Sequence, residues 1–497
     1  MFAPVTVGRP FVGEIAVDAT NTLFILSDQH TRSGLGCYGG PATTPHLDRL
    51  AERGTRFDTA YTNCPICVPV RASLATGRWV HQAGYWDNAF PYEGRVPSWH
   101  QRLRDGGVHV DSIGKLHFSR LEDDHGFTQE VEPLHVVDGI GDVLGCLRDD
   151  GPFRLKRSGI LEAGPGDSTY LQYDRRNADN GMAWLEQHRD DDKPWAAMLS
   201  FVCPHPPYIC PPEWFEHYID QDLPMPPQWR QDDWPAHPVI DHFRRFFDFH
   251  PQFDESQIRR LLAAYYGACS FLDEQIGRVL QQLESLGLSD RTRVIYSSDH
   301  GEHLGGRGIF GKFSLYDESA AIPLITAGPD VPHGHVCRTP ASLIDIHPSM
   351  VESVGLARHE EDAGLPGRSL WTIASNPDAQ RTVLSEYHAV GSRHASYMLR
   401  DARYKYNHYI QASPQLFDLQ ADPDELVDLA DDPACAEQLV DCETRLRRIL
   451  DPEAVDLRAR SDQEALVESM GGAAAVRDRG AFDNSPAPGE TPTFRQH

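Results

Sequence analysis

The stretch from Cys67 to Gly77 gathers residue types that can do chemistry at one predicted helix start. It reads Cys-Val-Pro-Val-Arg-Ala-Ser-Leu-Ala-Thr-Gly. Pro69 suits the first turn of a helix, where its missing N–H costs nothing, and Gly77 is typical of a helix end. A thiolate or oxyanion at Cys67 would face unpaired backbone N–H groups and the positive end of the helix dipole. The pattern therefore predicts an anion site at Cys67, with Arg71 about one turn further along the helix.

Two dipeptides elsewhere in the chain, Asp28-Gln29 and Asp299-His300, each follow an apolar run. Together they offer two carboxylates, an amide oxygen and an imidazole, a donor set that suits a divalent cation bound mostly by oxygen. A single carboxylate after a strand is more often a helix cap than a ligand. The two dipeptides with Cys67 nevertheless predict one metal site.

The elements that must position these residues are short apolar runs alternating with amphipathic helical patterns, which favours a mostly parallel sheet covered by helices on both faces. The runs end beside Asp28, beside Lys115 and His117, beside His205, and beside Asp299. In open α/β sheets ligands gather beyond the carboxyl ends of the strands, so these segments are expected to assemble one site. The predicted strands are residues 22–27, 108–113, 195–202, 293–298 and 322–327, and the predicted helices are 45–53, 174–188 and 254–287.

From about Arg381 the pattern changes. Two short strands are predicted at 396–400 and 403–407, followed by a third at 416–419 and a helix near 436–450. This order indicates a smaller antiparallel α+β domain packed on the first. We therefore predict a catalytic domain at 1–380, a C-terminal domain at 381–470 and a polar tail at 471–497 that is ordered only by contact with the body or with another subunit.

Composition excludes some classes of partner. The chain has 497 residues and a formal net charge of -27, which argues against nucleic-acid or anionic-membrane binding as its main role. Residues 1–20 match neither an export signal nor a membrane span, and no later stretch is long and apolar enough to cross a bilayer. The ten cysteines are then expected to be reduced thiols in the cytoplasm. The polar tail favours a homo-oligomer, a dimer or a tetramer.

Taken together, these segments resemble the motifs of the sulfatase family, which belongs to the alkaline phosphatase superfamily. The stretch at Cys67 is similar to its signature, a cysteine or serine followed by x-Pro-x-Arg and, after four residues, Thr-Gly. The remaining matches are Asp28-Gln29, Gly114-Lys115-Leu116-His117, Pro204-His205-Pro206, Ser298-Asp299-His300-Gly301, Gly311-Lys312 and, in the C-terminal part, Leu416-Phe417-Asp418-Leu419 with Asp422-Pro423-Asp424-Glu425.

Two further segments favour the arylsulfatase or choline-sulfatase-like branch: Trp86-Asp87-Asn88-Ala89, and Phe118 directly after Gly-Lys-Leu-His. Two positions depart from the pattern of many sulfatases. Many members of the family have a second aspartate where this chain has Gln29, and an asparagine where it has His300. We expect calcium first, with manganese as the alternative. Phosphonate monoester hydrolases share Asp-Gln and Asp-His-Gly but lack Gly-Lys-x-His, which places sulfate esters first.

The resemblance implies an alkaline-phosphatase-like α/β fold, a large mixed sheet sandwiched by helices, and hydrolysis of small aryl or alkyl sulfate monoesters. It implies that a formylglycine-generating enzyme oxidises Cys67 to formylglycine, whose hydrate attacks sulfur and later expels sulfate. The implied metal ligands are Asp28, Gln29, Cys67, Asp299 and His300. The other implied roles are Arg71 holding the formylglycine, Lys115 and Lys312 holding sulfuryl oxygens, His205 protonating the leaving oxygen, His117 assisting formylglycine turnover, and Asn88 donating to the sulfate.

Other interpretations remain open from the sequence. A phosphonate monoester or phosphate diester hydrolase could use the same site. The alternative of a different class is a non-catalytic thiol or metal-binding protein, because Cys64 and Cys67 also form a C-x-x-C pair. No second such pair follows, and Pro-x-Arg suits neither role. Trp86 could line a leaving-group pocket, although burial in the core is the commoner role of a tryptophan.

Overall fold

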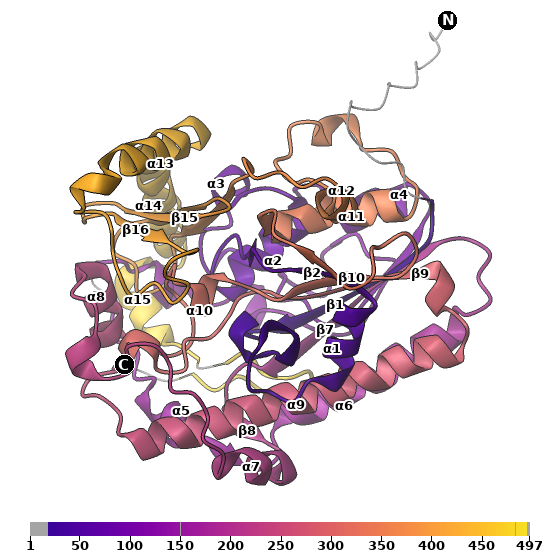
Figure 1. Cartoon of the computed structure of the whole chain (residues 1–497), viewed down its shortest axis with the longest axis horizontal. Coiled ribbons are helices and arrows are strands. Elements are labelled where there is room, and N and C mark those ends of the chain that lie inside the picture. The colour runs from indigo at the N-terminus through magenta and orange to yellow at the C-terminus, as the bar shows by residue number, and fades with distance from the viewer. Residues whose placement is uncertain (1–17, 150, 483, 495–497) are drawn as a thin grey trace, which may run out of the picture.

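The computed structural model describes residues 18–149, 151–482 and 484–494, and the expectation for the first 17 residues lies outside this part of the chain. An eight-stranded sheet crosses the molecule in the order β11-β2-β10-β9-β1-β7-β4-β5 (Figure 1). Of its seven strand pairs, the two that involve β10 are antiparallel and the rest are parallel. The predicted mixed, mostly parallel sheet is confirmed.

The strands of this sheet are β1 (Asn21–Asp28), β2 (Gly54–Phe57), β4 (His109–Lys115), β5 (Gln129–Leu134), β7 (Trp195–Pro204), β9 (Thr292–Ser298), β10 (Leu324–Ala327) and β11 (His335–Cys337). Two small parallel pairs flank it: β3 (Ala60–Tyr61) with β12 (Ala341–Ser342), and β6 (Gly164–Pro165) with β8 (Ile209–Cys210).

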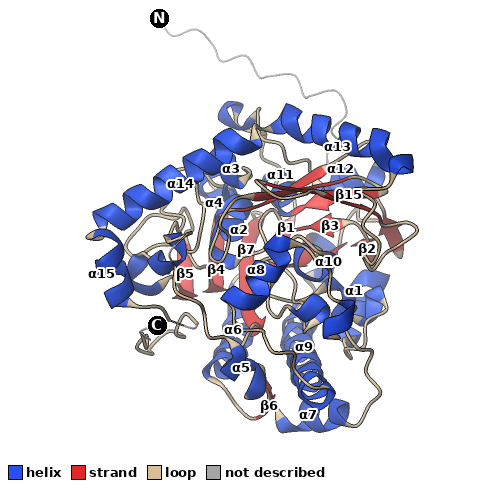
Figure 2. Cartoon of the chain, turned by 90° about the vertical axis from the view of Figure 1, so that its left-hand side faces the viewer, coloured by secondary structure: helices blue, strands red, loops and turns tan. Residues whose placement is uncertain are grey.

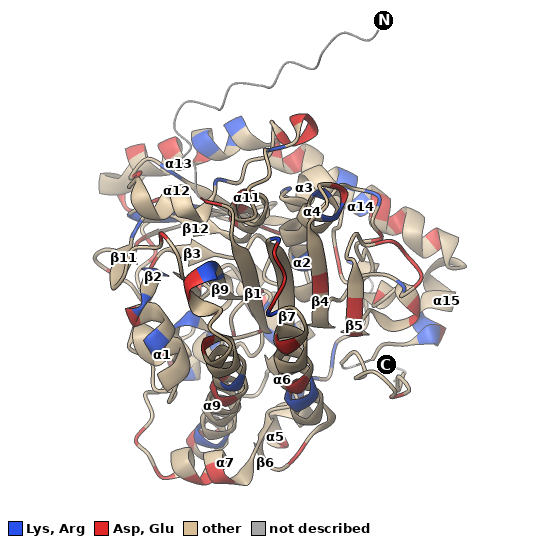
Figure 3. Ribbon diagram, turned by 90° about the vertical axis from the view of Figure 1, so that its right-hand side faces the viewer, with Lys and Arg blue, Asp and Glu red and all other residues tan. Residues whose placement is uncertain are grey.

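Both faces of the sheet are buried, which explains why its central strands are uninterrupted apolar runs. Successive residues of β1 alternate between two cores: Leu23 and Ile25 pack on one side, Phe24 and Leu26 on the other. Figure 3 shows α6 and α9 side by side below the central strands β1 and β7. The core that contains Leu23 and Ile25 includes residues of α1 (Pro45–Glu52), α6 (Thr169–Gln187) and α9 (Glu255–Ser285). The core that contains Phe24 and Leu26 includes residues of α2 (Cys67–Thr76), α4 (Trp99–Asp105), α11 (Ile346–Ser353) and α12 (Leu370–Ser375).

The longest helix, α9, begins where the sequence predicts. Asp254 accepts a hydrogen bond from the Gln257 backbone N–H at 3.0 Å, and the Gln257 side chain accepts one from the Asp254 N–H at 2.9 Å, a reciprocal cap. The shorter helices are α3 (Val80–Ala83), α5 (Arg157–Leu161), α7 (Pro212–Ile219), α8 (Pro238–Phe246) and α10 (Asp317–Ala320).

A separate antiparallel sheet, in the order β13-β14-β15-β16, follows the large one in the chain. Its strands are β13 (Val383–Tyr387), β14 (Ser396–Arg400), β15 (Tyr404–Tyr409) and β16 (Gln415–Asp418), and α13 (Ala436–Ile449) packs on it. This small α+β unit confirms the predicted second part of the fold class. Figure 2 shows α13 and the long helix α14 (Pro452–Ser469) along one side of the molecule.

The segment expected as a polar tail, 471–497, contains regular structure. Helix α15 (Gly472–Arg479) follows α14, and Val476 and Ala481 pack with Val143 and Leu144 of the main body. The described residues from α15 to Ala481 are therefore packed against the body of the chain. Among the described residues no helix is both long and apolar enough to span a bilayer.

Candidate active site

The carboxyl ends of three strands of the large sheet, β1, β4 and β9, bring the predicted site together. Asp28 ends β1, Lys115 ends β4, and Asp299 follows β9 directly. All three side chains are buried, and Lys115 Nζ lies 2.5 Å from Asp28 Oδ2. His205 lies just beyond the end of β7. Residues far apart in the chain thus meet at one edge of the sheet, as the strand pattern predicts.

Gln29 turns the chain sharply after β1. It has a left-handed backbone, with φ of 67°, which is uncommon for a residue other than glycine and costs of order 1–3 kcal/mol. Contacts on both sides fix this turn: its N–H donates to Asp299 Oδ1 at 3.1 Å, and its carbonyl accepts from the Tyr265 hydroxyl at 2.7 Å. The side-chain oxygen then accepts a hydrogen bond from Lys312 Nζ at 2.8 Å.

Cys67 is the first residue of α2, as the proline pattern predicts. The helix stops at Gly77, whose φ of 66° favours glycine and where an added Cβ would lie 2.9 Å from His347. At the helix start, Asn88 Oδ1 accepts from the Val68 N–H at 3.2 Å, which leaves the NH2 group of the same amide as a donor.

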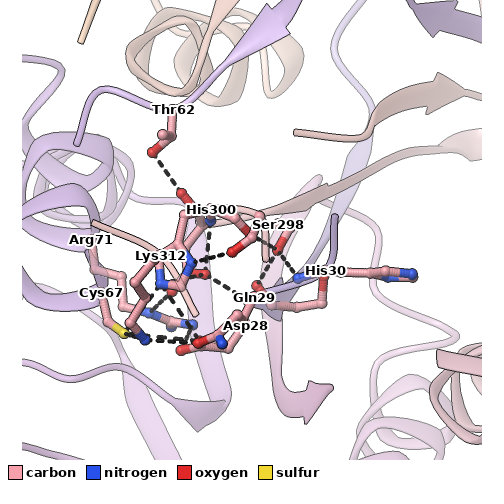
Figure 4. A network of polar contacts seen from close by, with 12 residues as sticks. Asp28, Gln29, His30, Thr62, Cys67, Arg71, Ser298, His300 and Lys312 are labelled. Carbon is pink, nitrogen blue, oxygen red and sulfur yellow. Dashed lines mark hydrogen bonds and ion pairs between the residues drawn. The ribbon is translucent and has the colours of Figure 1, made fainter. Parts of the chain in front are cut away.

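Three groups surround the Cys67 sulfur (Figure 4). Lys312 Nζ donates to it at 3.1 Å, His300 Nε2 lies 3.3 Å away, and Asp28 Oδ1 lies 3.8 Å away. Asp28 and Lys312 also shift the acidity of the thiol. Burial, with Asp28 adding to it, raises the pKa of Cys67 although Lys312 opposes the shift. The unmodified residue is thus a thiol and a weak nucleophile.

Arg71 ties this helix to the two carboxylates. Its Nε donates to Asp299 Oδ2 at 2.9 Å, one terminal nitrogen lies 3.4 Å from Asp28 Oδ2, and the other donates to the Lys115 carbonyl at 2.8 Å. Arg71 is 1% exposed, so these contacts neutralise its charge in the absence of water. Arg71 therefore fixes the position of Cys67 relative to the carboxylates rather than facing the cavity.

The same residues fit a divalent cation. One ligand atom from each of Asp28, Cys67, Asp299 and His300 lies within 4.8 Å of the others. His300 Nδ1 interacts with the Gly301 carbonyl at 3.1 Å, which leaves Nε2 as the ligand atom, and Nε2 lies 3.6 Å from Asp299 Oδ1. Two carboxylates, an imidazole and the nearby amide oxygen of Gln29 form a mainly oxygen donor set, which suits calcium or manganese.

The charges around the site favour the ionised forms of Asp28 and Lys312. Burial raises the pKa of Asp28, but Lys115 above all, with His205, Lys312 and His300, holds it well below its ordinary value. For Lys312 burial favours the neutral amine, yet Cys67, Asp28 and Asp299 raise its pKa above the ordinary value. The site thus combines an ionised carboxylate with a protonated lysine at the sulfur atom.

The two predicted histidines differ in their contacts. Neither ring nitrogen of His117 has a hydrogen-bond partner among the described residues, and burial, with Lys115 and Arg71, holds its pKa well below the ordinary value. His205 Nδ1 lies 2.8 Å from the Pro206 carbonyl, and burial with Lys312 lowers its pKa well below the ordinary value. Both imidazoles are therefore neutral before substrate arrives. A neutral His117 can accept a proton.

A cavity of about 290 Å³ opens above Cys67. Six predicted site residues line it, namely Gln29, Cys67, Asn88, His117, His205 and Lys312. The other five, Asp28, Arg71, Lys115, Asp299 and His300, are absent from the lining and contact one another or Cys67 from below. The predicted site is thereby divided into a surface that can touch substrate and a buried layer that holds it.

Sequence reasoning missed most of the cavity walls. Tyr170 comes from α6, Phe247 and Phe249 from the segment after α8, and Phe482 from beyond α15. Phe247 stacks on Phe313 with ring centroids 4.1 Å apart. The only sequence signal for the cavity walls was the high aromatic content of residues 209–251. The composition of a loop does not show which of its side chains face the site. Trp86 does not line this cavity and donates instead to Asp462 Oδ2 at 2.8 Å.

The wall from the C-terminal segment also holds polar groups. Asn484 and Ser485 line the cavity with Phe482, and the Ser485 carbonyl accepts a hydrogen bond from the Tyr170 hydroxyl. This contact joins the C-terminal segment to α6 beside the site. Residues predicted as a terminal tail thus contribute to the cavity.

The thiol-pair interpretation finds no support in this environment. Cys64 is completely buried, and burial raises its pKa well above the ordinary value of a thiol. All ten cysteines are free thiols. Reactive cysteine pairs need an accessible thiolate, which neither Cys64 nor Cys67 provides here.

The sheet, its covering helices and the candidate metal-binding cluster at the strand ends place the chain among the hydrolases of the alkaline phosphatase superfamily. The sulfatase family model matches residues 20–356, and a model of the C-terminal part of N-sulphoglucosamine sulphohydrolase matches residues 301–451. The chain therefore belongs to the sulfatase family, whose enzyme class is that of the sulfuric ester hydrolases.

Individual proteins agree with this placement. The chain is 30% identical over 447 residues to the choline-sulfatase of Rhizobium meliloti (strain 1021), covering 83% of each chain. It is 29% identical over 444 residues to arylsulfatase K of Homo sapiens, covering 84% of this chain and 80% of that one. Among solved structures it is similar to a phosphonate monoester hydrolase from Silicibacter pomeroyi, with a TM-score of 0.71 and 25% identity, covering 86% of this chain and 94% of that one.

Proposed function

We propose that this sulfatase hydrolyses sulfate monoesters of small aryl or alkyl alcohols, with Cys67 converted to formylglycine as its nucleophile. The observation that carries the proposal is the position of Cys67. Its side chain lines the floor of the cavity while also contacting Lys312, His300 and Asp28. A nucleophile formed there would meet substrate on one side and the metal ligands on the other.

Asp28, Gln29, Asp299 and His300 would hold the divalent cation, with calcium first and manganese as the alternative. When bound, this ion supplies positive charge that lowers the pKa of a hydroxyl and stabilises sulfuryl oxygens. Lys312 supplies a second positive charge at the same place, because its Nζ lies 3.1 Å from the Cys67 sulfur. Lys115, paired with Asp28 in the buried layer of the site, adds a positive charge below the residues that line the cavity.

The reaction begins when a hydroxyl oxygen of hydrated formylglycine forms a bond to sulfur and the alcohol oxygen leaves. The leaving oxygen needs a proton, which we assign to His205. This imidazole is neutral in the free enzyme, and the negative charge of a bound sulfate ester raises its pKa so that it enters the complex protonated. The NH2 group of Asn88 donates to the sulfate.

Release of sulfate uses the second hydroxyl of the same residue. A neutral His117, whose nitrogens have no other partner among the described residues, accepts the proton of that hydroxyl. The carbon–oxygen bond to sulfate then breaks, the aldehyde re-forms and sulfate departs. Serine at this position has no second hydroxyl and would remain sulfated, which explains the need for the modification. A formylglycine-generating enzyme is therefore the partner that the chain requires.

A phosphonate monoester or phosphate diester hydrolase is the second candidate, favoured by the similarity to the phosphonate monoester hydrolase structure. Turnover of 4-nitrophenyl sulfate and of a 4-nitrophenyl phosphonate monoester by the metal-loaded protein separates the two. We expect the higher kcat/KM for sulfate, and loss of both activities in Cys67→Ala but not in Cys64→Ser. A higher kcat/KM for the phosphonate would establish the second candidate instead.

A further inference from the structure

Three metal-ligating side chains meet at the start of β4, at the opposite end of this strand from Lys115. His109 and Asp111 are two residues apart on the strand, so their side chains share one face. His188 directly follows α6, which packs against β4. One ligand atom from each of these three residues lies within 4.8 Å of the others. Lys115 lies six residue steps beyond His109 along the extended strand, about 20 Å, so this cluster is not part of the active site.

The carboxylate of Asp111 has one oxygen atom that could bind a cation. It is 1% exposed, and its Oδ2 accepts from Trp184 Nε1 at 2.7 Å and lies 2.8 Å from His109 Nε2. Its Oδ1 is buried and has no hydrogen-bond partner among the described residues. A buried carboxylate oxygen without a donor is costly. A cation bound by Asp111 and His109 would replace the hydrogen bond that now joins these two side chains.

His188 has the orientation of a metal ligand. Its Nδ1 lies 2.8 Å from Asp191 Oδ2, which leaves Nε2 as the atom that can bind. Its ring stacks on Trp184 with centroids 4.2 Å apart, and the His109 ring lies 4.7 Å away. Metal-binding histidines commonly give their second nitrogen to a carboxylate, which fixes the ring and raises its basicity. Asp191 holds this place beside His188.

We propose that His109, Asp111 and His188 bind a zinc ion, with Asp191 as a positioning residue. Two imidazoles and a carboxylate, with water in the fourth position, form a donor set that zinc prefers. His109 is 38% exposed, which gives an ion access from solvent. The bound ion would join the first residues of β4 to the end of α6, and its role is structural because it lies far from the cavity.

A second cluster in the chain serves as a matched control. His125 Nδ1 and His135 Nε2 both lie against the Glu130 carboxylate, at 2.8 and 3.1 Å, and His125 Nε2 lies 3.2 Å from the Ser119 hydroxyl. Both nitrogens of His125 are therefore already used. The donor types match those of the first cluster, but both nitrogens of His125 and both carboxylate oxygens of Glu130 are already engaged in hydrogen bonds.

The test is a zinc chloride titration of the calcium-saturated, full-length protein by isothermal titration calorimetry, with zinc per chain counted by elemental analysis after gel filtration. We expect one zinc ion in the wild type that is lost in His109→Asn/His188→Asn and kept in His125→Asn/His135→Asn. Asp191→Asn should weaken binding by about 10- to 100-fold. Sulfate ester turnover should be the same in the zinc-free wild type and in His109→Asn/His188→Asn.

Thermal unfolding separates loss of the site from loss of the fold. Without zinc the wild type and His109→Asn/His188→Asn should unfold at similar temperatures, and zinc should raise the unfolding temperature of the wild type alone. Equal zinc content in these two proteins, or loss of zinc only in the His125 cluster variant, would overturn the proposal. Loss of zinc only in Asp299→Asn would place the ion in the active site and overturn it as well.

Discussion

The Lys312 ammonium donates to the sulfur of Cys67 at 3.1 Å, although 245 positions separate the two residues in the chain. The same nitrogen donates to Gln29 Oε1 at 2.8 Å, so the lysine bridges the predicted nucleophile and the first metal motif. Nearby anionic groups keep its pKa above the ordinary value despite burial. A permanent positive charge is therefore positioned where sulfuryl oxygens would gain charge during the reaction.

Replacing Lys312 by methionine should lower kcat/KM for 4-nitrophenyl sulfate by about 100- to 1,000-fold, because a preorganised charge at the reacting centre is removed. The matched control is Lys193→Met, which removes an exposed lysine beside α6 and should leave kcat/KM unchanged. Thermal unfolding of both variants checks that the fold is intact. Full activity in Lys312→Met would show that this charge has no part in catalysis.

Asp299→Asn should abolish bound metal and activity together. The substitution keeps the shape of the side chain but removes the charge that balances Arg71 Nε at 2.9 Å and that faces His300 Nε2 at 3.6 Å. Inductively coupled plasma mass spectrometry measures the metal content. Asp273→Asn is the control, because this carboxylate instead accepts the backbone N–H groups of His46 and Leu47 at the start of α1. Metal retained in Asp299→Asn would mean that the ligand set is wrong.

Phe482→Ala should raise KM for aryl sulfates about tenfold while changing kcat little, because Phe482 is an apolar residue of the cavity wall and has no predicted role in the chemical step. The comparison variant is Leu457→Ala, an exposed residue of α14 that does not line the cavity. Steady-state kinetics with 4-nitrophenyl sulfate and with a small alkyl sulfate measures the effect. An unchanged KM for both substrates would remove the C-terminal segment from the substrate site.

Asp174 gives the stability of the protein a pH dependence of known sign. Its carboxylate accepts the N–H groups of Val202 and Cys203, at 2.9 and 2.7 Å, just before His205, and burial raises its pKa from 3.8 to about 6. Between these values the folded state binds the proton more tightly than the unfolded state. This group therefore makes the free energy of unfolding fall, by about 2–3 kcal/mol, as pH rises from about 4 to about 6.

Urea unfolding of the wild type and of Asp174→Asn at several pH values measures this contribution. Between pH 4 and pH 7, the unfolding free energy of the wild type should fall by about 2–3 kcal/mol relative to that of Asp174→Asn. A difference that stays constant with pH would mean that Asp174 does not titrate in this range.

The sequence predicted the strand ends and the grouping of the candidate site residues because each lies in a short segment whose chemistry is local. Asp28 and Asp299 each follow an apolar run, and Cys67 begins a helix marked by Pro69 and Gly77. The buried layer of the site could be predicted for the same reason. Parallel strands with buried faces must end at one edge, so their carboxyl-terminal side chains must meet.

The cavity walls could not be predicted, because they come from segments without periodicity. Phe247 and Phe482 reach the cavity by the course of the chain after α8 and after α15. Helix α14 did carry a start signal, since Asp451 caps it and Pro452 is its first residue, but its polar sequence lacks a clear apolar stripe. The structure of these segments depends on burial against neighbouring elements rather than on a local sequence pattern.

Mass spectrometry of the tryptic peptide 57–71 tests the central claim most directly. Cleavage after Arg56 and Arg71 gives one peptide that contains both Cys64 and Cys67, so Cys64 serves as an internal control for thiol labelling. In active protein we expect Cys64 to be alkylated and Cys67 to have the mass of an aldehyde or its hydrate. A peptide alkylated at both cysteines, from protein with full sulfatase activity, would contradict the formylglycine mechanism.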